Sequence, residues 1–386
     1  MKRIHYISPS LLPSRAANSV HVMLQCDALR EVGALVTLYA KRTESDSNKL
    51  QGILKESYGV DTEHLNLVTY FSRFVRGDTL RIAMMAVLKI LFESRSDLVL
   101  SRNLYAAFIL SVIFKRSLIF ETHQLEYGFR KTFQRLIMTR PWVKTVLISE
   151  KLVECLVEHH DGIGPLRPIV LHDAAPSGIT PLALSLRRDE LSAAVGSDLS
   201  GWQCIAGYFG HLYEGRGIEI IEAMAARDPS CLFLVYGGND SDVEKRRMAN
   251  HLDNLRYVGH VPHPVAKRAM RSVDVLLMPY QREVSIGVAK HDTGRWMSPM
   301  KMFEYLATGI PVISSNLPVL REVLNDGENC LLVPPEDATA WSLALDKITG
   351  NPRLAAELGQ RGHQDYINKY NWTQRAVELL EAAKDL

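Results

Sequence analysis

Two charged side chains three residues apart, Lys301 and Glu304, lie in a segment that predicts a short helix. Ser298 can cap this helix, Pro299 suits its first position, and Gly309 ends it. The start of a helix offers free N–H groups and partial positive charge to an anion, and Lys301 adds a full charge there. Glu304 lies on the same helical face and can accept hydrogen bonds from a diol. The segment therefore predicts a site for a phosphate beside a sugar, as in a nucleotide.

The run 298–314 resembles the donor-binding segment of the retaining glycosyltransferases of family 4, in the subgroup with a Ser-Pro-x-Lys-x-x-Glu-Tyr motif. Members of this family have the GT-B fold. The resemblance implies that Glu304 holds the ribose of a nucleotide sugar. It also implies that the diphosphate is held by the first helical turn, through Ser298, Pro299, Met300 and Lys301. The same pattern fits an ordinary capped helix with a solvated lysine and glutamate, so the rest of the chain has to separate the two interpretations.

A glycine-rich segment at 207–218 predicts a strand, a turn and the start of a helix. In the family this position offers two basic side chains to the diphosphate, so the resemblance implies this role for His211 and Arg216, beside Gly210. Arginine keeps its charge and can bind phosphate oxygens through two parallel hydrogen bonds. Histidine is charged only when it is protonated. A glycine-rich turn with solvated charges is the alternative for this segment taken alone, and its agreement with Lys301 favours a phosphate site.

Two further strand ends resemble family contacts to the nucleotide. Gly237 follows an apolar run that ends at Tyr236, and it matches the turn below the nucleotide. The run 259–261 follows the next strand and matches the point where main-chain groups contact the base, which assigns this contact to Val261. Glycine after a strand is also ordinary loop chemistry, so both signals depend on the resemblance.

One histidine, His123, follows a predicted buried strand in the first half of the chain. The resemblance implies that His123 touches the donor sugar or the reacting centre. A lone histidine at a strand end can equally be a structural hydrogen-bonding group. With Arg216 and Lys301, which would stabilise the departing phosphate, His123 completes the set of catalytic candidates. The five cysteines are scattered and no pairing has the spacing of metal ligands, so neither a metal nor a cofactor is predicted besides the nucleotide sugar substrate.

The resemblance also implies a reaction that retains the configuration of the transferred sugar. The leaving phosphate would assist deprotonation of the acceptor hydroxyl on the same face, while closure of two domains excludes water. A two-step hydrolase finds no support, because neither a nucleophile elbow nor a close pair of carboxylates on one element stands out.

The largest departure from the family pattern concerns the sugar contacts. Many members carry a glutamate with seven residues between it and the one matching Glu304, and Trp296 stands there in this chain. An indole cannot accept a hydrogen bond from a sugar hydroxyl. The loop 281–297 could supply substitutes, with Asp292 preferred among Gly287, Asp292, Thr293 and Arg295.

A second departure lies near the N-terminus. Many members carry a glycine pair in the loop that matches 9–19, and this chain has none there. Either Asn18 and Ser19 replace the glycines at a phosphate or the loop serves the acceptor. The first helix is predicted to follow Asn18 or Ser19 and to end at Gly33.

The elements that position these residues alternate between short apolar runs and longer helical patterns, which is typical of parallel sheets with helices on both faces. The resemblance implies an α/β protein of GT-B type, two Rossmann-like domains with parallel sheets facing a central cleft. We expect an acceptor-side domain at 1–180, a linker at 181–200, a nucleotide-sugar-binding domain at 201–365, and a C-terminal helix at 366–386 that crosses back to the first domain. Strands are expected near residues 3–8, 34–40, 65–70, 97–101, 117–122, 144–149, 169–172, 203–209, 231–236, 255–258, 273–278, 311–314 and 330–333.

The length and charge of the chain limit the number of domains and the kinds of binding partner that can be expected. The 386 residues suit two domains with separate cores. With 45 basic and 43 acidic residues the chain has no overall field suited to nucleic acid. The N-terminus enters a strand without the pattern of a signal peptide, and the longest apolar run is too short to cross a bilayer, so we expect a cytoplasmic protein. Residues 126–144 interleave basic and aromatic side chains, which suits peripheral contact with an anionic membrane, although a core helix with a solvated face fits as well.

These observations predict a metal-independent, retaining glycosyltransferase that moves a hexose-type sugar from a nucleotide diphosphate sugar to a hydroxyl of a glycan or lipid-linked acceptor. By resemblance the pathway is the biosynthesis of cell-envelope polysaccharide or glycoconjugate. Two alternatives stay open: a noncatalytic nucleotide-sugar-binding subunit and a nucleotide-sugar epimerase of the same fold. The base, the sugar and the acceptor are not determined by the sequence.

Overall fold

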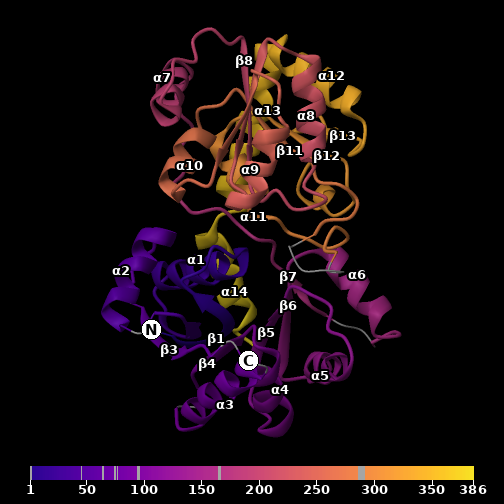
Figure 1. Cartoon of the computed structure of the whole chain (residues 1–386). Coiled ribbons are helices and arrows are strands. Elements are labelled where there is room, and N and C mark those ends of the chain that lie inside the picture. Colours follow the sequence, from indigo (N-terminus) through magenta and orange to yellow (C-terminus); the bar gives the residue numbers. More distant parts are fainter. Residues whose placement is uncertain are drawn as a thin grey trace. The chain divides into compact units, whose positions relative to one another are not determined.

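The chain forms two compact units (Figure 1). The computed structural model describes residues 2–44, 46–62, 65–73, 75, 77–93, 96–163, 167–285 and 292–386. Unit 1 comprises Met1–Asp173 and Trp372–Leu386, and unit 2 comprises Ala174–Asn371. Each unit contains one parallel sheet with helices packed on it, as the alternation of apolar runs and helical patterns predicts.

Unit 1 is built on a seven-stranded sheet in the order β3-β2-β1-β4-β5-β6-β7. Its inner strands β1, β4, β5 and β6 are mostly buried runs, as expected for a parallel sheet covered on both faces, whereas the edge strands β3 and β7 are partly exposed. The elements in chain order are β1 (Arg3–Leu12), α1 (Ala17–Glu31), β2 (Leu35–Arg42), α2 (Ser47–Tyr58), β3 (Asn66–Phe71), α3 (Asp78–Leu91), β4 (Leu98–Ser101), α4 (Leu104–Phe108), the π-helical η1 (Ile109–Ile113), β5 (Leu118–Thr122), α5 (Phe129–Met138), β6 (Val143–Leu147), α6 (Glu150–His159), β7 (Ile169–Val170) and, from the C-terminus, α14 (Trp372–Ala382).

Unit 2 is built on a six-stranded sheet in the order β10-β9-β8-β11-β12-β13. One hydrophobic cluster lies on each face of this sheet. The elements are α7 (Leu184–Val195), β8 (Cys204–Phe209), α8 (Ile218–Arg227), β9 (Cys231–Tyr236), α9 (Asp240–Ala249), β10 (Leu255–Gly259), α10 (His263–Met270), β11 (Val275–Met278), α11 (Met300–Thr308), β12 (Val312–Ser315), the 3-10 turn η2 (Leu320–Glu322), β13 (Leu331–Val333), α12 (Ala338–Thr349) and α13 (Pro352–Asn368).

Each strand expected from the sequence is present, and the first one is longer than expected. It pairs with β2 again at Leu11 and Leu12 after an irregularity that begins beyond Ile7. Pro9 lies inside this irregularity and has no N–H to donate, so a bulge lets the strand continue past it. Part of the predicted loop 9–19 is therefore strand.

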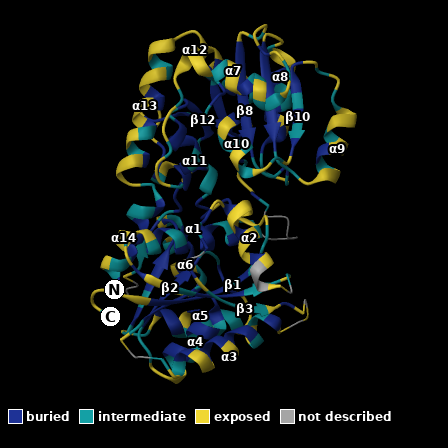
Figure 2. Cartoon of the chain, turned by 90° about the vertical axis from the view of Figure 1, so that its left-hand side faces the viewer, coloured by how far each residue is buried: buried dark blue, intermediate teal, exposed yellow. Residues whose placement is uncertain are grey.

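Helix α1 is buried around most of its circumference, unlike an ordinary surface helix (Figure 2). It packs against α14, so the C-terminal helix covers the face that would otherwise meet water. This arrangement buries polar side chains of α1, among them His21 and Gln25. Helix α1 begins at Ala17, close to the predicted start.

The segments between the two sheets differ from the expected layout. The predicted linker 181–200 contains α7, which belongs to unit 2 and packs against α10. The predicted C-terminal segment 366–386 begins inside α13 of unit 2, and its part from Trp372 onward belongs to unit 1.

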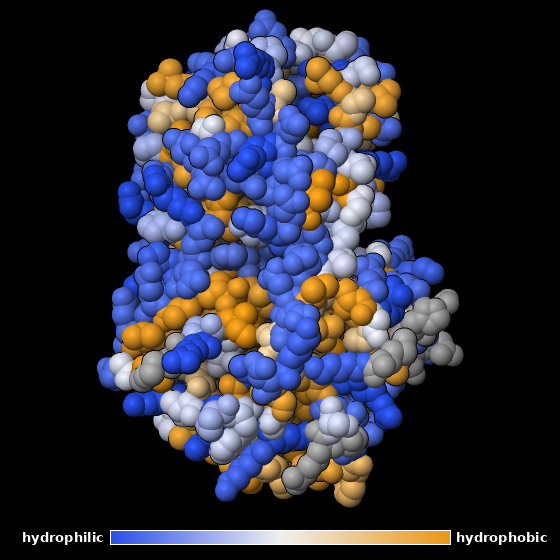
Figure 3. All heavy atoms as spheres, turned by 180° about the vertical axis from the view of Figure 1, so that it is seen from behind, coloured by the Kyte–Doolittle hydropathy of each residue, from blue (hydrophilic) through white to orange (hydrophobic). Residues whose placement is uncertain are grey.

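The surface is mixed in character. Figure 3 shows one face, on which hydrophobic side chains gather in patches on the part that belongs to unit 1. Exposed apolar residues of unit 1 concentrate on α3 and the residue after it, with Leu80, Met84, Leu88 and Phe92 between 42% and 89% exposed. None of the helices in the described residues has both the length and the hydropathy to span a membrane.

Candidate functional site

The predicted nucleotide residues of unit 2 follow the carboxyl ends of neighbouring strands. Gly210 comes after β8, Gly237 after β9 and Val261 after β10, and Tyr280 comes after β11. In an open parallel sheet these ends meet at one edge, where ligands bind. The sheet order β10-β9-β8-β11 makes the four strands adjacent, so the topology brings these segments together.

Helix α11 presents Lys301 and Glu304 at this edge. The helix begins at Met300, and its N-cap is Pro299 in an extended conformation without a side-chain capping bond. The prediction that Ser298 caps the helix and that Pro299 opens it was therefore wrong by one residue. The predicted end at Gly309 is confirmed, with φ of 69°.

A tyrosine fixes α11 to the end of β8. The amide of Phe209 donates to the Tyr305 hydroxyl at 2.8 Å, and Phe209 stacks on Tyr236 of β9 with ring centroids 4.7 Å apart. Tyr305 is fully buried. The start of α11 is thereby held in register with the turns that follow β8 and β9.

Lys301 is held over two aromatic rings. Its Nζ lies 4.0 Å from the ring centroid of Tyr208 and 4.7 Å from that of Tyr280. A ring face attracts a cation but supplies no counter-charge. Burial and the nearby guanidinium of Arg216 hold the pKa of Lys301 well below its usual value, although Glu304 raises it somewhat.

Arg216 lies on the same tyrosine. Its Nη1 donates to the Tyr280 hydroxyl at 2.9 Å, its Nη2 donates to the Ser285 carbonyl at 3.2 Å, and its guanidinium carbon lies 5.1 Å from the Tyr280 ring centroid. Tyr280 itself is buried. One ring thus positions two cations, and neither has a carboxylate within 4 Å among the residues that the structure describes.

Glu304 is an ionised carboxylate with basic neighbours. Its Oε1 lies 3.4 Å from Nε2 of His263. Burial alone would raise the pKa of Glu304, but the hydrogen bond and charge of His263, with the charges of Lys267 and Lys301, lower it overall. A carboxylate held ionised in this way can accept hydrogen bonds from sugar hydroxyls.

Two glycines leave room at the strand ends. A Cβ on Gly210 would come within 2.8 Å of Lys301 Nζ, so the missing side chain leaves space for the lysine. Gly237 has φ of 100°, and a Cβ there would collide with the Gly210 carbonyl oxygen. The backbones of the turns after β8 and β9 are therefore in contact, with no room for a side chain between them.

His211 and Val261 lie beside this edge. His211 stacks on Tyr213 with centroids 4.7 Å apart, and its pKa is lowered by burial and by the charges of Arg216 and Lys301. The imidazole is accordingly neutral near pH 7 and adds no positive charge to the site. Val261 is partly buried and packs on the adjoining hydrophobic cluster.

The predicted sugar-contact loop is only partly described. Gly287 lies outside the described residues. Asp292 Oδ1 accepts hydrogen bonds from the amides of Val284 and Gly294 at 2.7 and 2.8 Å, so this carboxylate fixes the shape of the loop. Trp296, at the position of the missing glutamate, is 7% exposed.

His123 lies in unit 1 at the end of β5. Arg102 Nη2 lies 3.0 Å from His123 Nδ1, and because a guanidinium only donates, Nδ1 accepts. Nε2 then carries the proton and donates to Glu121 Oε1 at 2.8 Å. Burial and the charge of Arg102 lower the pKa of His123 to about 3. Both ring nitrogens are engaged, as in the structural alternative for this residue.

Sequence reasoning missed the network behind His123. Glu121 is fully buried and accepts hydrogen bonds from Arg375 Nη2 at 2.9 Å and from Gln25 Nε2 at 3.0 Å. The Nε2 atom of His21 lies 3.0 Å from Glu121 Oε1. Arg375 comes from α14 and also donates to the His172 carbonyl at 2.9 Å. No sequence signal links these residues, because they are brought together by the return of the C-terminal helix to unit 1.

The same network contains a group that could hold a metal, His21, His123 and Asp173, with ligand atoms within 4.8 Å of one another. Their atoms are already committed, since His21 Nδ1 lies 2.8 Å from Asp173 Oδ1 and His123 bonds to Arg102 and Glu121. The positive charges of Arg102 and Arg375, next to this cluster, disfavour the binding of a metal cation there. The donor set therefore fits a hydrogen-bond network.

Comparisons with known proteins agree with this architecture. Residues 218–351 match a family model described as "Glycosyl transferases group 1". A phosphatidyl-myo-inositol mannosyltransferase of Mycolicibacterium smegmatis is 28% identical over 169 residues, which cover 43% of this chain and 40% of that protein. The chain thus spans less than half the length of this curated relative.

Solved structures match over the whole chain. Sucrose-phosphate synthase from Thermosynechococcus elongatus superposes with a TM-score of 0.73 at 18% identity, covering 100% of this chain and 99% of that one. Anabaena HepE, solved in complex with UDP and glucose, gives 0.73 at 14% identity, covering 100% of both chains. At such identities the likeness concerns the fold. The chain has the α/β fold of GT-B glycosyltransferases, and its residues 218–351 are similar to the glycosyl transferases of group 1.

Proposed function

We propose that this chain is a glycosyltransferase that uses a nucleoside diphosphate sugar as donor and passes the sugar to a hydroxyl group of an acceptor. The observation that carries the proposal is the pair of cations, Lys301 and Arg216, on the single ring of Tyr280. Like charges repel, and burial makes each more costly, as the lowered pKa of Lys301 reflects. A diphosphate bound between them would remove both penalties.

The neighbouring groups suit the remainder of a nucleotide. The amide of Met302 donates to the Pro299 carbonyl at 2.9 Å, and the amides of Met300 and Lys301 before it, at the start of α11, are suited to hold an anion. Glu304, one turn further along α11, would accept hydrogen bonds from the ribose hydroxyls. Gly210 and Gly237 leave the backbone at the strand ends accessible, and Val261 would offer main-chain groups to the base.

The chemistry follows from where charge develops. As the bond between the sugar carbon and the phosphate oxygen breaks, negative charge grows on the diphosphate, and Lys301 and Arg216 stabilise it. The departing phosphate oxygen would take the proton of the attacking acceptor hydroxyl on the same face, so that the configuration of the sugar is retained. His123, neutral and with both ring nitrogens engaged, would act by contact with the sugar and would carry no positive charge.

The finer expectations belong to this proposal as well. They are a hexose donor, a glycan or lipid-linked acceptor, independence of metal ions, and action in envelope polysaccharide synthesis at the cytoplasmic side of a membrane. Peripheral contact draws support from the exposed rings of Tyr127 and Phe129, which are 62% and 66% exposed. Phe133 supports it less, because this ring stacks on Phe108 at 4.1 Å inside unit 1.

Donor turnover without acceptor tests the proposal. The chain is incubated with UDP-, GDP-, ADP- and dTDP-hexoses, with and without a chelator, and released nucleoside diphosphate and the anomeric form of the freed sugar are followed by NMR. We expect slow release from one donor with retained configuration, and a loss of about 100-fold or more in Lys301→Ala. Lys347→Ala, on the exposed face of α12, is the matched control.

Three results would contradict the proposal in different ways. Nucleotide binding without release would indicate a noncatalytic binding protein. Release of an epimerised sugar would indicate an epimerase. Equal rates in Lys301→Ala and in the control would remove the proposed role of the cation pair.

A further inference from the structure

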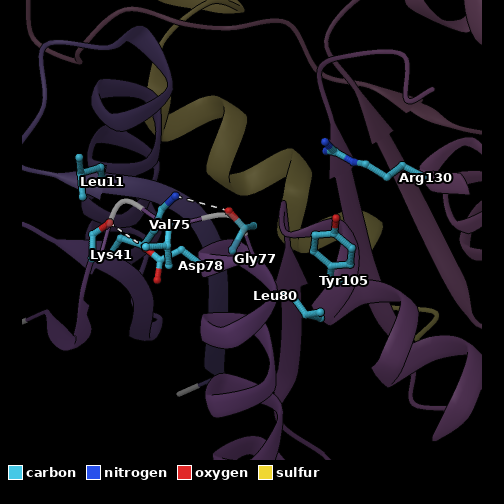
Figure 4. Close-up of a pocket in the computed structure, with 10 residues that line it drawn as sticks. Leu11, Lys41, Val75, Gly77, Asp78, Leu80, Tyr105 and Arg130 are labelled. Atoms are coloured by element: carbon cyan, nitrogen blue, oxygen red, sulfur yellow. Dashed lines mark hydrogen bonds between the residues drawn. The ribbon is translucent and has the colours of Figure 1, made fainter. Parts of the chain in front are cut away.

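A hollow in unit 1 is lined by residues that include Lys41, Tyr105 and Arg130 (Figure 4). Lys41 lies at the end of β2 and Tyr105 follows β4, so this hollow belongs to the acceptor side that is already expected of unit 1. A different feature lies at the amino ends of the unit 2 strands, the edge opposite the candidate donor site. It is a pair of thiols, Cys204 and Cys231, for which the proposed function has no role.

The register of the unit 2 sheet brings these two cysteines together. Cys204 is the first residue of β8 and Cys231 the first residue of β9, and the parallel strands pair them directly. Both side chains belong to the hydrophobic cluster on one face of the sheet. Helix α8 separates the two cysteines in the chain, so no local spacing rule predicts the pair.

The spacing of paired strands suits a bond between the two sulfur atoms. Neighbouring strands lie about 4.7–4.9 Å apart, within the range of about 4.4–6.8 Å over which a disulfide joins two Cα atoms. The side chains of a directly paired couple stand parallel, so their Cβ atoms are about as far apart as the strands. A relaxed disulfide has its Cβ atoms about 3.5–4.5 Å apart, so the strand starts must close slightly, and the resulting bond is easily reduced.

The two thiols already interact. A hydrogen bond with Cys204, together with burial, raises the pKa of the Cys231 thiol well above its usual value. Cys231 therefore keeps its proton while Cys204 is a free thiol. A buried cysteine of unit 2 that lies elsewhere, Cys330, belongs to the cluster on the other face of the sheet and cannot reach this pair.

The pair lies one residue below the surface. Gln203 and Ser230, which directly precede the two cysteines, are exposed. Cys204 is 4% exposed, whereas Cys231 is fully buried. A small reagent therefore meets Cys204 first, and Cys231 lies behind it as the second thiol.

We propose that Cys204 and Cys231 form a dithiol site that hydrogen peroxide converts reversibly into a disulfide. The Cys204 sulfur attacks one peroxide oxygen and breaks the O–O bond, which gives a sulfenic acid and one water molecule. The Cys231 sulfur then displaces the sulfenic hydroxyl, and its proton leaves with that hydroxyl as a second water molecule. The two sulfur atoms lose two electrons in total, and peroxide gains them. An external dithiol restores both thiols by exchange and is itself oxidised to a disulfide.

The test uses the full chain, reduced and then freed of reductant, and treated with hydrogen peroxide under native conditions. The remaining thiols are alkylated after denaturation and counted by mass spectrometry, and the peptides that contain Cys204 and Cys231 are mapped without reduction. All five cysteines are free thiols before treatment. We expect two thiols to be lost, these two peptides to be linked, and dithiothreitol to restore both thiols.

Variants assign the order of the two steps. In Cys231→Ala no second thiol is present to close the bond, so the sulfenic acid at Cys204 should persist and react with dimedone. In Cys204→Ala the buried Cys231 should be oxidised about tenfold more slowly or less, because reactivity follows exposure. Cys330→Ala is the matched control, since it removes a buried thiol from the other face of the sheet and should still lose two thiols.

The proposal is overturned if the native chain keeps its five thiols, or if all five react together, which would indicate oxidation of the unfolded chain. It is also overturned if Cys204 is oxidised without a link to Cys231, or if either alanine variant at the pair loses two thiols as Cys330→Ala does. Circular dichroism verifies that the variants are folded, and a folding defect in one variant of the pair leaves the other decisive. The measurement needs neither donor nor acceptor, so its result is independent of the proposed function.

Discussion

The return of the C-terminal helix to unit 1 can be tested at Arg375. This side chain is 3% exposed and donates to Glu121, to Gln25 and to the carbonyls of Leu171 and His172. Arg375→Met keeps the volume of the side-chain stem but leaves the Glu121 carboxylate without its only guanidinium partner among the described residues. Breaking a buried pair from one side costs about 3–5 kcal/mol, so we expect a loss of this size in the free energy of unfolding of unit 1 at pH 7.

The direction in which the loss of stability changes with pH follows from the pKa of Glu121. Burial alone would raise the pKa of Glu121, but Arg375, His21 and His123 hold it well below its usual value. In the native chain Glu121 therefore contributes stability above about pH 4.5, which is lost as the pH falls through the depressed pKa. In Arg375→Met the pKa of Glu121 rises, so the difference between the two chains should shrink as the pH falls from 7 through that raised value.

Urea unfolding followed by tryptophan fluorescence measures the effect, because the Trp372 ring lies 5.4 Å from the Arg375 guanidinium. Only the transition of unit 1 should move. Arg353→Met is the matched control, since Arg353 forms an exposed pair with Glu357 at 2.8 Å and such pairs contribute at most about 1 kcal/mol. A loss in Arg375→Met no larger than in the control, or one independent of pH, would refute the reasoning.

Three further predictions concern unit 2. A bound anion raises the depressed pKa of Lys301, so the affinity for a nucleoside diphosphate, measured by calorimetry, should fall as the pH rises above the pKa of Lys301 in the free chain. Lys301→Met should lose this pH dependence. An affinity that rises with pH would contradict the prediction. Tyr280→Phe removes the hydroxyl that accepts from Arg216 and should slow donor turnover about fivefold to tenfold while Lys301 keeps its ring contact; an unchanged rate would show that the bond does not position the arginine. Gly237→Ala should lower the unfolding free energy by about 3 kcal/mol or more, because the new Cβ meets a backbone oxygen, whereas Gly327→Ala, with φ of 74° but open space around it, should cost only about 1 kcal/mol; equal losses in thermal unfolding would refute the steric argument.

The strands could be predicted because buried parallel strands read as apolar runs. This physics is local, and it located β5, β8, β9 and β11 to within about two residues. The one extension, β1 through Leu12, required knowledge of a bulge at Pro9 that lets the pairing with β2 resume. Apolar patterning does not encode such pairing across strands.

The charged residues of the site could be named from the sequence, but the side chains that hold them in place could not. Lys301 and Glu304 follow from the helix and its resemblance to a known segment. The aromatic cage of Tyr208 and Tyr280, and the pairing of Glu304 with His263, depend on strand ends that are brought together only by the sheet order. These contacts join residues 21 to 93 positions apart, beyond the reach of any local spacing rule.

The charge of the histidines also depended on the fold. His211 and His123 could have been cationic from sequence alone, and burial beside other cations lowers the pKa of both. The placement of Arg375 against Glu121 is likewise tertiary, because the two residues are 254 positions apart. The position of the helix cap at Pro299 shows that a capping pattern specifies a helix start only to within a residue.

The central claim is that the start of α11 binds the diphosphate and ribose of a nucleotide. Its most direct test is calorimetric titration with UDP, GDP, ADP and dTDP of the native chain, Glu304→Ala, and the control Glu357→Ala on the exposed surface of α13. We predict that one nucleotide binds the native chain and the control tightly. Its affinity for Glu304→Ala should be lower by a factor of about ten or more. If no nucleotide binds, or if Glu304→Ala binds as tightly as the control, the assignment of this helix as the donor site is contradicted.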